Sequence, residues 1–300
     1  MLRGEVVRPD GATIAYDVAG DGPPAIFLHG LTNRRQGWDP VTDLLASDLT
    51  CIRIDFRGHG ESSTAVDYGM PTLVADVRAV ADELGVENPA VIGSSFGGGA
   101  AAVYAALNPA RAVVCVDNTL RFGDFAPLVQ SRAQDLRGED AMQAVWEIEQ
   151  ELGLEPYADI AGSERRVLAF PPEVVRGVWA QMLTTPPAEL TAISEMLLPA
   201  ITVPLLALHG SQPADDYASW LTRLAPTAEV EVWEGTGHLL HLVDPARFAE
   251  RPAHAARLSG EGGIRTLERA CAPYSLSRRV PSATRPPLRA LGSIVGSNGA

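Results

Sequence analysis

The strongest constraint on the fold of this chain is a repeated pattern, in which short apolar runs alternate with helical stretches. The runs end in loop residues and occupy 24–30, 50–56, 89–94, 112–117, 203–210 and 228–235. Such continuously apolar runs are typical of strands that are buried on both faces. Between two of them, Leu73, Val77, Val80 and Leu84 recur at helical spacing. We therefore predict an α/β fold with a mostly parallel sheet and right-handed crossovers, opened by an antiparallel hairpin over 4–18.

Two segments depart from this alternation. Residues 120–200 show no strand pattern, and several prolines interrupt their helical patches. We expect this segment to be a helical cap, inserted into an α/β core formed by 1–119 and 201–258. Residues 259–300 show no sustained periodicity, and we expect a disordered or non-native tail there.

The end of the second core segment contains a helical pattern with a proline inside it. The pattern starts near Pro245, and Pro252 lies seven residues further along the chain. Because proline lacks the backbone N–H and its ring clashes with the preceding turn, we predict that this helix breaks early.

Composition limits the partners and the location of the chain. The formal net charge is −13, and the 24 basic residues, all arginine, form no basic stripe, which argues against a nucleic-acid partner. Neither an apolar leader nor a run of about 18 apolar residues occurs, so we expect no membrane span and a cytoplasmic protein. The three cysteines are widely spaced, lack C-x-x-C spacing and are expected to be reduced. We expect neither a metal nor a cofactor.

The stretch Gly93-Ser94-Ser95-Phe96-Gly97 fits the nucleophile elbow G-x-S-x-G when it is centred on Ser95. The elbow is a strained strand-to-helix turn, so it needs small residues on both sides of the nucleophile. Centring the pattern on Ser94 would place the bulky Ile92 and Phe96 at those positions. A phosphate-binding loop is the competing interpretation, but no Gly-Lys-Ser/Thr follows and the chain contains no lysine. Ser95 is therefore the candidate nucleophile.

Three further motifs accompany the elbow in a fixed order: "FLHG" at 27–30, "DFRGHGESS" at 55–63 and "EGTGHLLH" at 234–241. With these four motifs, residues 5–250 resemble the α/β-hydrolase superfamily, on its serine-nucleophile esterase and haloperoxidase-like branch. The resemblance implies a mostly parallel central sheet flanked by helices, with a helical cap. It also implies a Ser-His-Asp triad in which His238, after the last strand and a Gly-Thr-Gly turn, is the base that activates Ser95.

The acid of this triad is left open by the sequence. The position usual for the family, after the strand ending "LALHG", holds Pro213, and Asp215 and Asp216 lie slightly later. Those two aspartates can instead open the helix that follows them, where acids favour the helix dipole. The superfamily also uses an acid after the preceding strand, which here ends at Asp117. We favour Asp117, with Asp215 and then Asp216 as alternatives.

The resemblance also implies an oxyanion hole and a pocket. Two main-chain N–H groups, those of Leu31 and Phe96, occupy the positions that would stabilise an oxyanion. His29 is expected to brace the first loop beside the substrate pocket. The aromatic candidates for the pocket walls are Phe125, Trp146 and Trp179.

These expectations predict a serine hydrolase that cleaves a carboxylic ester or a related small acyl compound through an acyl-enzyme. One alternative is a non-hydrolytic or C–C-bond-cleaving enzyme on the same triad, such as a lyase or a cofactor-free haloperoxidase-like enzyme, because fold and triad do not determine the reaction. Another is a non-catalytic module that binds a small ligand. Ser95 in place of an aspartate argues against dehalogenase and epoxide hydrolase chemistry. The oligomeric state is left open.

Overall fold

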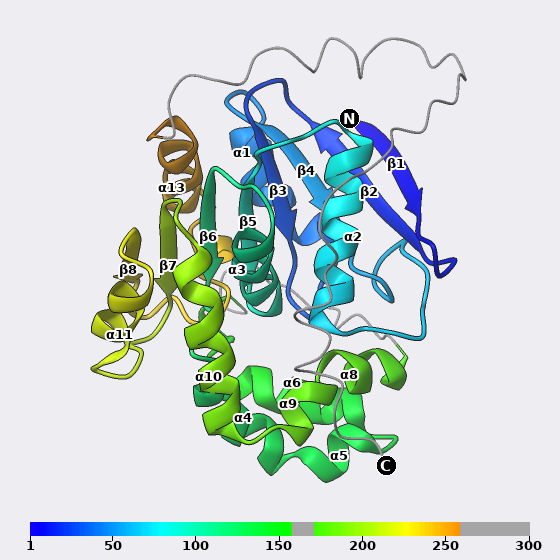
Figure 1. The fold of residues 1–300 in the computed structure, drawn as a ribbon, viewed down its shortest axis with the longest axis vertical. Helices are drawn as coiled ribbons and strands as arrows, with labels where there is room; N and C mark the ends of the chain where they lie inside the picture. The colour runs from blue at the N-terminus through cyan, green and yellow to red at the C-terminus, as the bar shows by residue number, and fades with distance from the viewer. Residues whose placement is uncertain (158–170, 259–300) are drawn as a thin grey trace. The chain divides into compact units, whose positions relative to one another are not determined.

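The computed structural model describes residues 1–157 and 171–258, so the tail predicted over 259–300 lies outside the described residues. Within them is one eight-stranded sheet with the order β1-β2-β4-β3-β5-β6-β7-β8 (Figure 1). The strands are β1 Leu2–Val7, β2 Thr13–Ala19, β3 Pro24–Leu28, β4 Thr50–Ile54, β5 Ala90–Ser94, β6 Ala112–Val116, β7 Leu205–His209 and β8 Ala228–Val232.

The sheet confirms the predicted α/β fold. Strands β3 to β8 pair in parallel, whereas β1 and β2 form the opening antiparallel hairpin, and β2 pairs antiparallel with β4. Strands β4, β5 and β6 are buried along their whole length, which explains the apolar sequences of β5 and β6, whereas β4 carries the buried Arg53 in an ion pair with Asp17. Because these strands are parallel, the loops after β3, β5, β6, β7 and β8 open at the same edge of the sheet.

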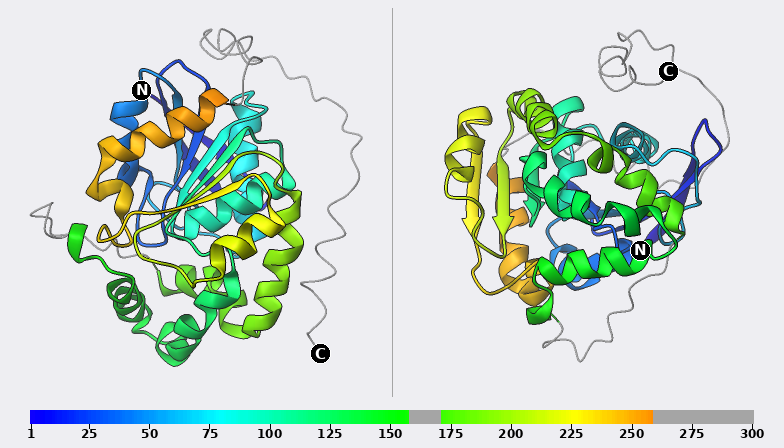
Figure 2. Two further views of the ribbon diagram at one scale, coloured as in Figure 1. Left: turned by 90° about the vertical axis from the view of Figure 1, so that its left-hand side faces the viewer. Right: turned by 90° about the horizontal axis from the view of Figure 1, so that it is seen from below.

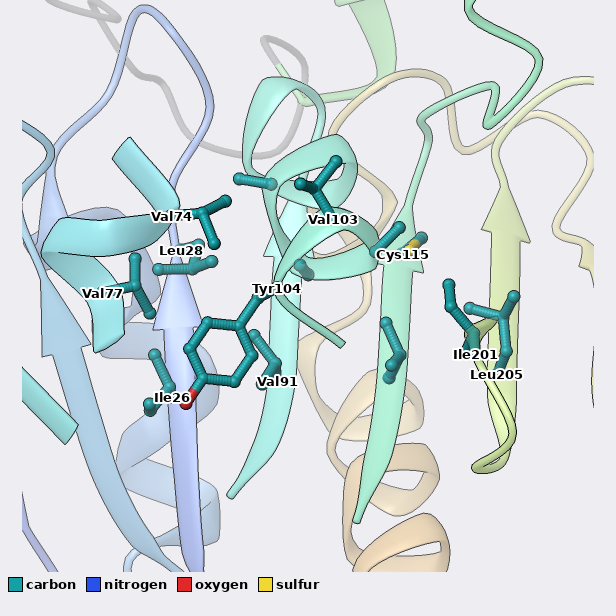
Figure 3. Packing of buried hydrophobic residues seen from close by; sticks show 14 of the residues in the cluster. Ile26, Leu28, Val74, Val77, Val91, Val103, Tyr104, Cys115, Ile201 and Leu205 are labelled. Atoms are coloured by element: carbon teal, nitrogen blue, oxygen red, sulfur yellow. The ribbon is translucent and has the colours of Figure 1, made fainter. Parts of the chain in front are cut away.

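Helices cover both faces of the sheet (Figure 2). One apolar cluster joins the sheet to α2 (Met70–Glu83), α3 (Phe96–Leu107) and α11 (Tyr217–Leu224), and Figure 3 shows part of its packing around Tyr104. The opposite cluster includes side chains of η1 (Arg35–Trp38), α1 (Asp39–Leu45), α12 (Leu240–Val243) and α13 (Pro245–Leu258). No described helix is long and apolar enough to cross a membrane.

The predicted early break of the last helix is wrong. Helix α13 continues through Pro252 to Leu258. Phe248 and Ala249 are buried against the cluster that includes α1, and this packing holds the first turns in place. A proline removes one backbone hydrogen bond and can be accommodated by a kink when packing supports the helix.

A helical insertion, residues 120–200, lies between β6 and β7. Most of its described helices gather at one end of the sheet (Figure 1) and form a cluster with Leu31 and Phe96, which follow β3 and β5, while Leu197 and Leu198 pack in the cluster that includes α2 and α3. The described helices of the insertion are α4 Phe122–Ser131, α5 Ala133–Arg137, α6 Ala141–Glu151, α8 Pro172–Val178, α9 Ala180–Thr184, α10 Pro187–Leu197 and η2 Leu198–Ala200. The insertion therefore packs on the edge of the sheet where the strands β3 and β5 end.

Candidate active site

Ser95 occupies the turn between β5 and α3, where its backbone takes φ 53° and ψ −123°. A non-glycine residue is strained in this conformation, so the surrounding structure must impose it. Gly93 and Gly97, on either side of Ser95, allow the backbone segments around the turn to pack closely. A Cβ on Gly93 would lie 1.9 Å from the Gly97 carbonyl oxygen, and a Cβ on Gly97 would lie 2.4 Å from that of Leu28. The turn thus has the geometry of the elbow that the sequence predicts around Ser95.

His238 lies in the loop after β8 and is almost completely buried. Its main-chain N–H donates a hydrogen bond to the Gly153 carbonyl at 2.8 Å, which ties this loop to the helical insertion. Gly237 has φ 62°, and a Cβ there would lie 2.2 Å from the same carbonyl oxygen. The glycine before His238 therefore allows the loop to approach the insertion.

Asp117 follows β6 and forms a hydrogen bond with His238, from Nδ1 to Oδ2, at 2.6 Å. Its other oxygen, Oδ1, accepts the Gly210 N–H at 2.9 Å, and its own N–H donates to the Leu208 carbonyl. Because a carboxylate only accepts, the Nδ1 of His238 carries the proton, and Nε2 is left to accept one. The carboxylate is thus held from two sides in an orientation suited to a histidine base.

The two alternative acids lie elsewhere. Asp216 forms a bidentate ion pair with Arg121, with N–O distances of 2.8 and 2.9 Å. This ion pair lowers the pKa of the Asp216 carboxyl. Asp215 is exposed beside it, at the start of α11. The structure brings Asp117 to His238 and pairs Asp216 with Arg121.

The two main-chain donors expected for an oxyanion hole flank Ser95. Phe96 is the first residue of α3, where the N–H groups have no partner within the helix. Leu31 follows Gly30, and a Cβ on Gly30 would lie 3.3 Å from the Ser95 Cβ. In the described part of the chain, neither amide donates a backbone hydrogen bond to another loop. The positions suit stabilisation of a developing oxyanion.

His29 braces the loop after β3. Its Nε2 accepts the Phe56 N–H at 3.1 Å, so Nδ1 carries the proton and donates to the Gly30 carbonyl at 2.7 Å. Burial lowers the pKa of His29 well below its ordinary value. The neutral ring therefore supports Gly30 and Leu31, as the sequence suggests, and also borders the hollow described next.

A hollow lies over Ser95. Its described lining consists of His29, Gly30, Thr32, Asn33, Gly37, Trp38, Ser94, Ser95, Glu149, His238, Leu239 and His241. Of the residues predicted for the pocket wall, His29 lies here. Ser95 and His238 thus face one space, although they are 143 positions apart in the sequence.

The three aromatic residues predicted for the pocket wall are not part of this described lining, and their role at a substrate pocket stays a prediction. Phe125 and Trp179 pack against each other inside the insertion, with ring centroids 6.3 Å apart, in a cluster that also contains Leu31. Trp146 packs in a small cluster with Leu239, which lines the hollow. The three side chains thus contribute to apolar packing next to residues of the site.

Sequence reasoning missed several polar residues of the lining, among them the buried Thr32, Ser94, Glu149 and His241. Strand alternation is the signal that could have found Ser94, because it shares a face of β5 with Ile92. Glu149 comes from α6, and no local pattern indicates which face of that helix meets the site. In the described ranges, no group of three or more His, Cys, Asp or Glu residues is arranged to hold a metal ion.

Residues 25–251 match a family model described as "Alpha/beta hydrolase family". A non-heme haloperoxidase of Rhodococcus erythropolis is 28% identical over 255 residues, covering 78% of this chain and 92% of that protein. A serine hydrolase-like protein of Danio rerio is 36% identical over 121 residues, covering 39% of this chain and 34% of that protein. The matched part thus spans about a third of the length of the Danio rerio relative.

A similar fold occurs in solved structures. The structure of a thermophilic esterase from Thermogutta terrifontis superposes with a TM-score of 0.69 and 22% identity, covering 86% of this chain and 99% of that one. The esterase from Exiguobacterium antarcticum superposes with a TM-score of 0.68 and 18% identity, covering 84% and 98%. At these identities the similarity shows the fold.

Proposed function

The chain belongs to the alpha/beta hydrolase family, and on this basis we propose that it is a serine hydrolase that cleaves a carboxylic ester or a related small acyl compound. One observation carries the proposal. A strained Ser95 and a buried His238 line one hollow, and the proton-bearing Nδ1 of His238 is bound to Asp117. This is the set of groups that nucleophilic acyl transfer requires.

In the proposed mechanism, Ser95 Oγ attacks the substrate carbonyl carbon while His238 Nε2 takes the hydroxyl proton. The N–H groups of Leu31 and Phe96 stabilise the oxyanion that forms. His238 then gives its proton to the leaving oxygen, and the C–O bond breaks to leave an acyl-enzyme. A water molecule, deprotonated by the same nitrogen, attacks the acyl carbon. The bond from the acyl carbon to Ser95 Oγ then breaks, and His238 Nε2 returns the proton to Oγ, which releases the acid and regenerates free Ser95 and neutral His238. Asp117 orients the imidazole and stabilises its cation throughout.

Two alternatives use the same fold. The haloperoxidase similarity is compatible with non-hydrolytic or C–C-cleaving chemistry on the triad. A non-catalytic ligand-binding module would need neither the strained elbow nor the hydrogen bond between His238 and Asp117. Backbone strain persists where the surrounding structure imposes it and often accompanies function, so the geometry supports an enzyme.

The test is covalent labelling with a fluorophosphonate, followed by mass spectrometry and by hydrolysis of p-nitrophenyl esters of rising acyl length. We expect one adduct on Ser95 in the native chain, no adduct in Ser95→Ala, and loss of esterase activity in proportion to labelling. Ser47→Ala, an exposed serine on the surface near α1, is the matched control. An unlabelled Ser95 in the folded protein would overturn the proposal, while labelling without ester turnover would favour the non-hydrolytic alternative.

A further inference from the structure

The hollow over Ser95 has an unusually polar wall. Small-molecule pockets are lined mainly by apolar and aromatic side chains, with a few polar groups that orient the ligand. Here, beyond Ser95, His238 and His29, polar side chains come from four separate parts of the fold: Thr32 and Asn33, Ser94, Glu149, and His241. Trp38 and Leu239 are the large apolar side chains in the described lining.

Ser94 contributes a buried hydroxyl that lacks a partner. Successive side chains of a strand point to opposite faces, so Ser94 shares a face of β5 with Ala90 and Ile92. Those two residues pack in the same cluster as Trp38, which lines the hollow. Ser94 is 3% exposed, and its Oγ has no hydrogen-bond partner within the described residues. A buried hydroxyl without a partner is costly, so its position points to a ligand or water in the hollow.

His241 supplies a second unpartnered atom. It lies on α12, its ring centroid is 4.5 Å from that of Trp38, and it is 2% exposed. Its Nδ1 has no hydrogen-bond partner in the described chain. Burial, together with the nearby His238, lowers the pKa of His241 to about 3. The ring is therefore neutral and offers one donor and one acceptor nitrogen.

The described lining also includes a carboxylate. Thr32 donates its hydroxyl hydrogen to Glu149 Oε1, which joins the loop after β3 to helix α6 beside the hollow. Both side chains are buried, so the carboxylate acts in a medium where charge interactions are poorly screened. An anionic substituent on the substrate would be repelled here, whereas a neutral hydroxyl can bond to the wall.

We propose that Ser94 and His241 form a polar subsite that selects esters with a neutral hydroxyl group close to the scissile carbonyl. This inference rests on the proposed hydrolase function and names the substrate class of the same site. A hydroxyl can both donate and accept, which matches the serine Oγ and the neutral imidazole. An alkyl substrate of equal length would leave both protein groups without a partner, and sites of this kind reject such analogues.

The test compares matched ester pairs that differ by one hydroxyl. Methyl 3-hydroxybutyrate against methyl butyrate places the group on the acyl side, and 2-hydroxyethyl butyrate against propyl butyrate places it on the alcohol side. The readout is the ratio of kcat/KM within each pair, measured by proton release. We expect one pair to show a preference of about 3- to 10-fold for the hydroxylated ester, as one or two neutral hydrogen bonds would give. The pair that shows the preference identifies whether the subsite binds the acyl side or the alcohol side of the ester.

The variants Ser94→Ala and His241→Phe should each move this ratio towards one, with folding checked by the melting temperature. Phenylalanine keeps an aromatic ring against Trp38, and Ser47→Ala should keep the native ratio. Methyl hydrogen succinate, with its carboxylate, should be the poorest substrate. In an enzyme that is labelled at Ser95, a kcat/KM ratio near one for both ester pairs would overturn the subsite but not the hydrolase function. A preference for the hydroxylated ester that persists in both variants would also overturn the subsite. Absence of labelling and of any turnover would instead refute the proposed function.

Discussion

Ser95 and Asp117 are the two non-glycine residues with positive φ in the described chain, at 53° and 45°. Each follows directly after a buried parallel strand, β5 and β6, which pair with each other. Ser95 donates its N–H to the Val116 carbonyl, and Asp117 donates its own to that of Leu208. Strain at adjacent strand ends is thus maintained by the ladder of the sheet, and both strained residues are members of the proposed triad.

At this scale we predict that Asp117→Asn lowers kcat by about 10⁴-fold, as the equivalent change does in the serine-protease triad. An asparagine at 117 can present its NH₂ group to His238 Nδ1, which favours the wrong tautomer. The measurement is steady-state ester hydrolysis with a check of folding by circular dichroism.

Asp216→Asn is the matched control for this prediction. The Asp216 side chain is 68% exposed in its ion pair with Arg121, and exposed pairs contribute little to stability. We expect its activity to stay within about twofold of native. The assignment of Asp117 fails if Asp216→Asn inactivates the enzyme and Asp117→Asn does not.

Elements differ in how far they could be predicted from the sequence. The buried strands were predictable because both faces of β5 and β6 pack against apolar residues, so their runs are almost continuously apolar. The acid of the proposed triad could not be predicted, because three aspartates follow strand ends and only the loop geometry decides which of them reaches His238. The polar lining of the hollow could not be predicted either, since it comes from single residues on separate elements.

Substitutions at two glycines test how tightly the turn between β5 and α3 is packed. A Cβ on Gly93 would lie 1.9 Å from the backbone oxygen of Gly97, and backbone cannot move aside without opening the turn. Gly99 lies in the same helix, α3, but its nearest contact would be the Asn118 side chain at 3.6 Å. We predict that Gly93→Ala lowers the free energy of unfolding by about 1–3 kcal/mol or more and reduces fluorophosphonate labelling.

Gly99→Ala should instead raise the free energy of unfolding by about 0.5–1 kcal/mol, since alanine loses less backbone entropy in a helix. That corresponds to a melting temperature about 1–4 °C higher. Thermal unfolding of the two variants beside the native protein makes the comparison. Equal effects of the two substitutions would show that the turn is not as tightly packed as its geometry indicates.

On the scale of the whole molecule, buried ionisable groups are spread through the core and not confined to the site. Arg35 and Arg53 share Asp17 and join the hairpin to β4 and its neighbouring loops. Arg57 binds Asp76 on α2, with both side chains almost completely buried. Removing one partner of such a pair leaves an uncompensated buried charge, which is strongly destabilising.

Buried histidines make the fold sensitive to acid. Burial lowers the pKa of His29, His209 and His241, in the last case to about 3, although Asp117 partly opposes the shift at His209. In the unfolded chain these groups titrate near pH 6.5. Between the lowered pKa of the folded state and the pKa of about 6.5 in the unfolded chain, the unfolded state binds more protons than the folded state. The free energy of unfolding therefore rises with pH in this range and falls as the pH drops below about 6.5.

We therefore predict that stability falls between pH 7 and pH 5, with about 2 kcal/mol of the loss due to His241. His29 and His209 act in the same direction, because burial lowers the pKa of both. Urea midpoints measured across this range test the prediction, and His241→Phe should make the pH dependence shallower by about 2 kcal/mol because phenylalanine does not titrate. A flat profile from pH 7 to pH 5 would mean that these histidines become protonated in the folded protein, which conflicts with the hydrogen bond that His29 Nε2 accepts from Phe56.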